Sequence, residues 1–190
     1  MTLARHRRTA LAGILALGLS ALSCTSRTAE TPGATQPAAM TPLQRGEYLS
    51  NIMGCNDCHT PGGLYGSPDV ERRLSGSEVG WQGPWGVSYG SNLTPDPETG
   101  LGNWTNVEIE RALRSGVRKD GSPVLPPMPW PNLANLTADD MSSLIAYLKS
   151  IPPIKHQIPA RVPPNGIPPG PVIPIPAPGS WDAPRTAPTP

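Results

Sequence analysis

The chain has few of the side chains that usually fill a protein core. Among its 190 residues there is no phenylalanine, and aromatic residues make up only 5%. Proline and glycine, which interrupt helices and strands, occur 27 and 20 times. A folded part with so little large apolar side-chain volume is typical of a protein whose core is completed by a cofactor or a cross-link.

An excess of basic charge is also missing. The formal net charge is +1, and three of the 15 basic residues lie near the amino terminus at Arg5, Arg7 and Arg8. If these are removed with a leader, 12 basic residues remain against 14 acidic ones, which gives a net charge of −2. No basic stripe is present, so we expect no nucleic-acid partner.

A long hydrophobic run is absent, but a short one follows the basic residues. The apolar run 9–21 is too short for a comfortable membrane span and is typical of a secretory signal. Residues 1–23 are therefore predicted to be a signal peptide, and the protein to be exported. The pair Arg7-Arg8 lacks the flanking residues that a twin-arginine signal would have.

Cys24 directly follows the predicted signal. The sequence Ala-Leu-Ser before it resembles the lipobox of bacterial lipoproteins, in which the cysteine becomes lipidated and amino-terminal. We predict a lipid anchor on Cys24, which would hold the protein on the periplasmic side of a bacterial membrane. Ordinary cleavage a few residues later, with Cys24 lost in the discarded piece, is the alternative.

Two segments of biased composition flank the middle of the chain. Residues 24–40 are polar and small, and predict a flexible linker. Residues 152–190 contain 14 prolines and predict an extended tail. This tail is interpreted either as disordered or as a docking segment, and the folded domain is predicted to span residues 41–151.

Three helices are predicted inside this domain. Thr41 with Gln44, and Thr105 with Glu108, form capping boxes, and Gly54 and Gly116 provide helix ends. A third helix is predicted to begin at Thr137, with an apolar stripe at the i, i+3, i+4 and i+7 positions Met141, Leu144, Ile145 and Leu148. No comparable strand pattern is recognisable. Long loops rich in glycine and proline join the helices, which favours an all-α fold wrapped around a large flat cofactor.

Residues 55–59 read Cys-Asn-Asp-Cys-His, the C-x-x-C-H signature of c-type haem attachment. One helical turn places Cys55 and Cys58 on the same side, where both sulfurs can form thioethers with one porphyrin. His59 is then held under the ring as an iron ligand. The sequence thus predicts one covalent haem c.

Other uses of this motif are less consistent with the rest of the sequence. A zinc site needs further ligands, and outside the leader only His156 remains. A thioredoxin-like dithiol needs a βαβ context, and a disulfide between Cys55 and Cys58 would leave His59 unexplained.

A sixth iron ligand is expected from a methionine. Met128 lies in a proline-stiffened segment far in sequence from His59, and is the predicted ligand. His156 is the alternative. Met53 is too near Cys55 to reach the opposite face of a haem, and Met141 is predicted to be a core residue.

The window 41–151 resembles a class I cytochrome c domain. Gly46 and Tyr147 match the positions at which the terminal helices of that family touch. The segments 92–105, Met128-Pro129 and 146–152 are similar to the haem domains in cytochrome subunits of membrane-bound alcohol and gluconate dehydrogenases.

This resemblance implies further roles around the haem. A backbone carbonyl from Pro61 or from Gly90-Ser91 is expected to accept a hydrogen bond from the ligand histidine. Trp104 and Trp130 would line the haem or bind a propionate, or alternatively only pack.

The predicted function is electron transfer and not catalysis. The partners would be redox proteins, either a dehydrogenase donor or a terminal oxidase acceptor, in brief contact with the haem edge. A five-coordinate haem enzyme or gas sensor is one alternative, and a module of a larger oxidoreductase that docks through its proline tail is another.

Overall fold

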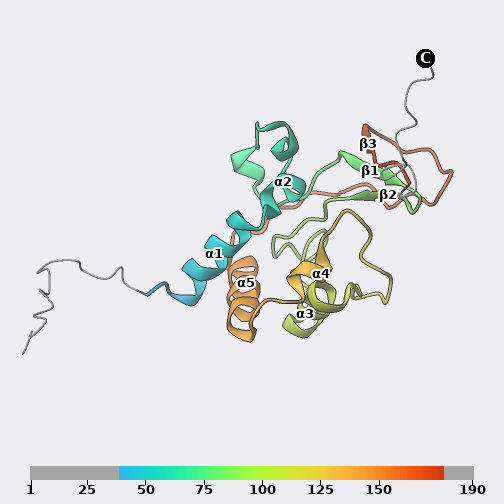
Figure 1. Ribbon diagram of the computed structural model, residues 1–190. Coiled ribbons are helices and arrows are strands. Elements are labelled where there is room, and N and C mark those ends of the chain that lie inside the picture. Colours follow the sequence, from blue (N-terminus) through green and yellow to red (C-terminus); the bar gives the residue numbers. More distant parts are fainter. Residues whose placement is uncertain (1–38, 178–190) are drawn as a thin grey trace, which may run out of the picture. The chain divides into compact units, whose positions relative to one another are not determined.

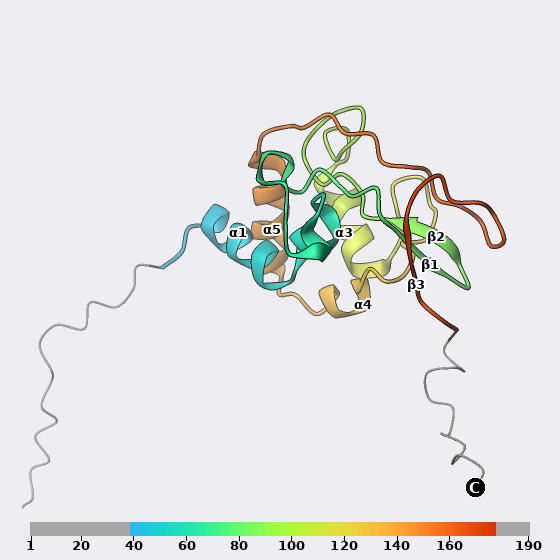
Figure 2. The ribbon, with the colours of Figure 1, turned by 90° about the horizontal axis from the view of Figure 1, so that it is seen from above.

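The computed structural model describes residues 39–177 (Figures 1 and 2). The predicted signal peptide, Cys24 and the linker up to residue 38 lie outside the described residues, as do residues 178–190. Within the described range, no helix is both long and apolar enough to cross a membrane.

The described chain contains five α-helices, two 3-10 turns and three short strands. The helices are α1 (Pro42–Ile52), α2 (Cys55–His59), α3 (Asn106–Ser115), α4 (Trp130–Leu133) and α5 (Ala138–Ser150), and the 3-10 turns are Gly63–Tyr65 and Val70–Arg72. The strands are β1 (Gly80–Gly83), β2 (Gly86–Tyr89) and β3 (Val172–Pro174).

The three helices predicted from the sequence are confirmed as α1, α3 and α5. Thr41 and Thr105 each complete the predicted capping box, and the Thr137 side chain accepts a hydrogen bond from the third helical N–H of α5. Gly116 ends α3 in the left-handed conformation with φ of 65°, which glycine adopts without a steric penalty. Local capping chemistry therefore determines where these helices begin and where α3 ends.

The core lies where α5 packs against α1 and α3. Met141, predicted to be a core residue, is 1% exposed. The buried apolar cluster consists of Leu74, Leu101, Ile109, Met141, Leu144, Ile145, Tyr147 and Leu148. Cys55 and Trp104 pack at its edge, so these two of the predicted haem residues are connected directly to the core.

Gly46 permits the close crossing of α1 and α5. A Cβ at this position would lie 2.1 Å from the carbonyl oxygen of Ser143 and 2.6 Å from Cβ of Tyr147. Only a residue without a side chain fits this contact. The expected small-residue contact between the first and last helices is thus present in the structure.

The prediction of an all-α fold is wrong, because the chain also forms a mixed three-stranded sheet. β1 pairs antiparallel with β2, and it pairs parallel with β3, which belongs to the predicted proline-rich tail. The first two strands have four residues each and glycine at three of their ends. Such short strands show no recognisable alternation, and β3 contains a proline, so the sequence pattern gave no sign of the sheet.

Figure 2 shows the chain beyond α5 running past the helices to the sheet. Along this path Ile154 accepts a hydrogen bond from Asn92, and Val162 forms an antiparallel bridge with Val87. Described residues after 151 therefore contact the rest of the fold.

Replacing Gly46 by valine is expected to lower the free energy of unfolding by about 2–3 kcal/mol, because the added side chain forces α1 and α5 apart. Urea unfolding followed by far-UV circular dichroism measures this change. Glu47→Ala, an exposed substitution on the same helix, is the control and should change stability little. An equal effect of both substitutions would contradict the proposed close crossing.

Candidate functional site

α2 presents the two motif cysteines on one helical turn. Gly54, with φ of 68°, directs the chain from α1 into α2 at Cys55. Cys55 and Cys58 are three residues apart and so lie on one side of the helix. Both are free thiols, and burial raises the pKa of Cys55 to about 11 and also raises the pKa of Cys58. No disulfide joins them, which leaves both sulfurs available for thioether bonds.

His59 ends α2 and is buried, with 9% of its surface exposed. Its Nδ1 lies 2.7 Å from the carbonyl oxygen of Ser91. Because a carbonyl only accepts, Nδ1 carries the proton and Nε2 keeps a free lone pair. Burial lowers the pKa of His59, although the bond to Ser91 acts in the opposite direction. Burial thus favours the neutral imidazole, and the bond to Ser91 orients it in the way that a metal ligand requires.

The segment that carries Ser91 lies tightly against α2. A Cβ on Gly90 would be 1.8 Å from the carbonyl oxygen of Cys58, so glycine is required for this approach. On the other side, the N–H of Gly76 donates to the carbonyl of His59 over 2.7 Å. Of the two carbonyl sources implied by the family resemblance, Ser91 holds the histidine, whereas Pro61 accepts from the N–H of Asp69.

Met128 is half-buried in the segment between α3 and α4. Its N–H donates to the carbonyl of Leu125 over 3.3 Å, and its own carbonyl accepts from Trp130.

His156, the alternative sixth ligand, uses both ring nitrogens elsewhere: Nδ1 lies 3.0 Å from Ser75 O, and Nε2 lies 2.7 Å from a Glu78 carboxylate oxygen. Neither nitrogen is free for iron, and ligation by Met128 stays a prediction.

Trp104 and Trp130 are both half-buried and occupy different surroundings. The guanidinium of Arg118 lies 5.8 Å from the centre of the Trp104 ring, and both residues line a cleft of about 470 Å³. The ring of Trp130 covers Gly116, where a Cβ would lie 2.4 Å from the indole. The structure thus gives each tryptophan a packing partner, and their predicted contact with haem stays a prediction.

Arg118 is a site residue that the sequence analysis missed. Its side chain is partly buried, and its Nη1 lies 3.4 Å from the hydroxyl of Ser91, whose carbonyl holds His59. Burial lowers the pKa of Arg118, while Asp120 opposes this effect. Among the described residues it has no carboxylate within salt-bridge distance. The sequence around a single arginine in a polar loop does not indicate that its side chain will contact Ser91.

Three buried polar atoms in the described part of the chain have no hydrogen-bond partner, and one of them belongs to Arg73, whose charge acts on Cys55. Within residues 39–177, Nε of Arg73, Nε1 of Trp85 and the hydroxyl of Tyr89 are buried and have no hydrogen-bond partner. Unpaired buried donors are costly, by about 1–3 kcal/mol each. The carboxylates of a haem are acceptors of the kind that such donors need. Together with two free thiols and an oriented histidine, the unpaired donor of Arg73 suits an acidic cofactor such as a haem.

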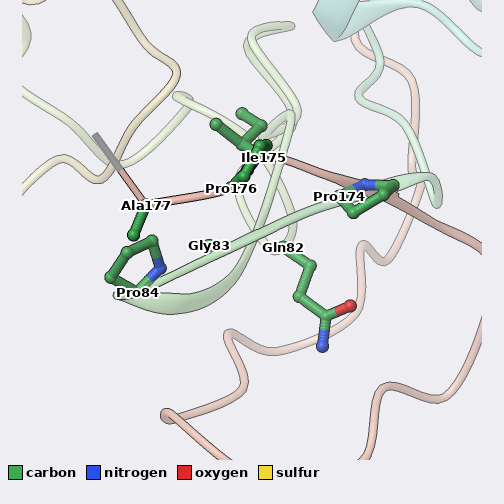
Figure 3. Close-up of a pocket in the computed structure, with 7 residues that line it drawn as sticks. All are labelled: Gln82, Gly83, Pro84, Pro174, Ile175, Pro176 and Ala177. Atoms are coloured by element: carbon green, nitrogen blue, oxygen red, sulfur yellow. The ribbon is translucent and has the colours of Figure 1, made fainter. Parts of the chain in front are cut away.

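Another cleft, of about 550 Å³, lies between the β1–β2 turn and residues 174–177 (Figure 3). Its lining is formed mainly by proline, glycine and aliphatic side chains. None of the predicted haem residues contributes to it. Within the described range, no group of three or more His, Cys, Asp or Glu side chains is arranged to hold a metal ion directly.

Comparison with known proteins identifies the chain as a homologue of c-type cytochrome subunits. In particular, it is 40% identical over 116 residues to the cytochrome c subunit of the quinone alcohol dehydrogenase of Gluconobacter oxydans. The aligned residues make up 60% of this chain and 23% of that subunit. It is 33% identical over 139 residues to the fructose dehydrogenase cytochrome subunit of Gluconobacter japonicus, 70% of this chain and 27% of that subunit. The gluconate 2-dehydrogenase cytochrome c subunit of Pantoea cypripedii is 36% identical over 105 residues, 55% of this chain and 22% of that subunit. No family model matches the chain.

These relatives confirm the resemblance to alcohol and gluconate dehydrogenase cytochrome subunits. All three are named as cytochrome subunits of their enzymes, which agrees with the prediction of an electron carrier and not a catalytic chain. Haem c is the cofactor that such relatives imply. The chain spans less than a third of the length of each of the three relatives described.

Proposed function

We propose that the chain is a single-haem electron carrier in which Cys55 and Cys58 bind haem c covalently and His59 ligates the iron. The observation that carries this proposal is the buried His59 ring, held by Ser91 with Nε2 free, one residue after the second of two free thiols. The sequence contains a single C-x-x-C-H motif, which supports one haem.

Haem c supplies one-electron chemistry, since its iron alternates between the ferric and ferrous states. The protein contributes fixed ligands and a defined electrostatic environment. Ser91 fixes the tautomer and the orientation of His59, and Met128 would supply a soft thioether that favours ferrous iron. Trp104 and Trp130 would cover parts of the cofactor. Residues held in this way need little rearrangement when the charge on the iron changes.

The proposal extends to location and partners. We propose that residues 1–23 direct export to the periplasmic side of a bacterial membrane, and that Cys24 carries a lipid anchor. The relatives described are cytochrome subunits of alcohol, fructose and gluconate dehydrogenases. A dehydrogenase is therefore the electron donor we favour, with a terminal oxidase as an acceptor.

Met128→Ala tests the proposed axial ligation. The ferric wild-type protein should show the weak long-wavelength charge-transfer band of methionine-ligated haem, and the variant should lose it. The variant should also bind carbon monoxide readily when reduced, because the sixth site is then open. Met53→Ala, a substitution beside the motif, is the control and should keep the band. A wild-type protein that lacks the band and binds carbon monoxide would favour a five-coordinate enzyme or sensor.

Arg118→Gln is expected to lower the haem reduction potential, on the order of 50 mV. The partly buried guanidinium favours the less positive ferrous state, and its removal favours the ferric state. Spectroelectrochemical titration measures the potential. Lys119→Gln is the control, because Lys119 is more exposed and lies 3.7 Å from a Glu108 carboxylate oxygen, so its charge is better screened. Equal shifts in both variants would contradict a special role of Arg118.

A further inference from the structure

The segment 154–174, here called the strap, connects parts of the fold that are distant in sequence. At its beginning, Ile154 O accepts from the Asn92 amide over 2.7 Å. At its end, Gly80 N donates to Pro171 O over 3.0 Å, and β3 joins the sheet. The strap thus follows the segments 75–78 and 92–99 and then reaches β1 and β2 (Figure 2).

In the middle of the strap, Val162 is joined to β2 by two backbone hydrogen bonds. Val87 N donates to Val162 O over 2.8 Å, and Val162 N donates to Val87 O over 3.0 Å. Gly86 lets the strands approach, since a Cβ there would lie 2.0 Å from Val162 O and its φ is 93°. Val87 is 1% exposed. The bridge is therefore closely packed, with Val87 buried and Val162 half-buried.

The residues next to this bridge both reach the segment 123–128. Arg161 precedes Val162, and its Nη1 donates to the carbonyl of Pro123 over 3.0 Å. Ser88 follows Val87, and its hydroxyl donates to the carbonyl of Pro126. The bridge thus places two donors side by side against the segment that ends at Met128.

Few backbone donors are available to hold the segment 123–128. Three of its six residues are prolines, which have no N–H to donate. Its internal bond from Met128 N to Leu125 O is long, at 3.3 Å. The N–H of Val124 donates to the carbonyl of Gly116 over 2.8 Å and ties the beginning of the segment to the end of α3. The hydrogen bonds from Arg161 and Ser88 to the carbonyls of Pro123 and Pro126 add two side-chain contacts to this backbone contact, and the second of them lies two residues before Met128.

The same strap also supports the histidine side of the site. His156 binds the carbonyl of Ser75, and the next residue, Gly76, donates to the carbonyl of His59. Asn92, which holds Ile154, directly follows Ser91. One continuous segment thus contacts the surroundings of His59 and, through Arg161, those of Met128.

We propose that the strap is a positioning device for the sixth ligand: Arg161 and Ser88, aligned by the Val87–Val162 bridge, hold Met128 on the haem iron. This proposal rests on the proposed function, in which Met128 is that ligand. It assigns to the proline-rich segment after α5 a role within its own domain and not in docking to a partner.

The test uses the full-length haem protein with Arg161→Ala, Ser88→Ala and the double substitution. Added imidazole competes with methionine for ferric iron, so its apparent affinity rises when Met128 is held less firmly. We expect an increase of about threefold for each single variant and about tenfold for the double variant, with a weakened charge-transfer band. Arg161→Lys, which keeps a donor, should restore part of the wild-type behaviour.

Lys155→Ala is the matched control. Lys155 is also a cation of the strap, but its ion pair is with Glu98, outside the segment 123–128. It should leave imidazole affinity unchanged. Haem content and circular dichroism show whether each variant is folded, and the single variants decide the result if the double variant is not.

Unchanged imidazole affinity in folded Arg161→Ala and Ser88→Ala proteins, with the band intact, would overturn the positioning role alone. An equal rise in Lys155→Ala would also overturn it, since the effect would then be general loosening. A wild-type protein without the methionine band would overturn the proposed ligation and this inference together.

Discussion

The hydrogen bond between His59 Nδ1 and the carbonyl of Ser91 is the interaction on which the site depends. A helix of only five residues cannot by itself fix the rotation of an imidazole at its last position. The bond does so by bringing in a segment more than thirty residues away, and this approach requires glycine at position 90. The loops that surround α2 are therefore arranged to present one carbonyl to one histidine.

The remaining contacts keep that segment in place. Asn92 binds Thr99 and Ile154, and Lys149 of α5 donates to the carbonyls of Leu101, Gly102 and Trp104. Side-chain donors thus replace the backbone ladders that glycine- and proline-rich loops cannot form. With few large apolar residues available, the chain holds its loops by such bonds around a small helical core.

Comparison of sequence and structure shows which features are local. Capping boxes at Thr41 and Thr105 located two helices correctly, because a cap depends on residues three positions apart. The sheet was missed, because β1 and β2 are short and β3 is paired only through a contact distant in sequence. Arg118 and Arg161 were missed for a related reason, since their acceptors lie 27 and 38 residues away.

By itself, the sequence determined the chemistry of the site: a cysteine pair one turn apart, a following histidine and helices with defined ends. These follow from covalent spacing and local hydrogen bonding, which act over a few residues. Only the tertiary structure decided which carbonyl orients His59, that both nitrogens of His156 are occupied, and that the segment after α5 returns to the sheet. Such choices depend on packing between distant segments, where many partners are chemically equivalent until the fold brings one of them within reach.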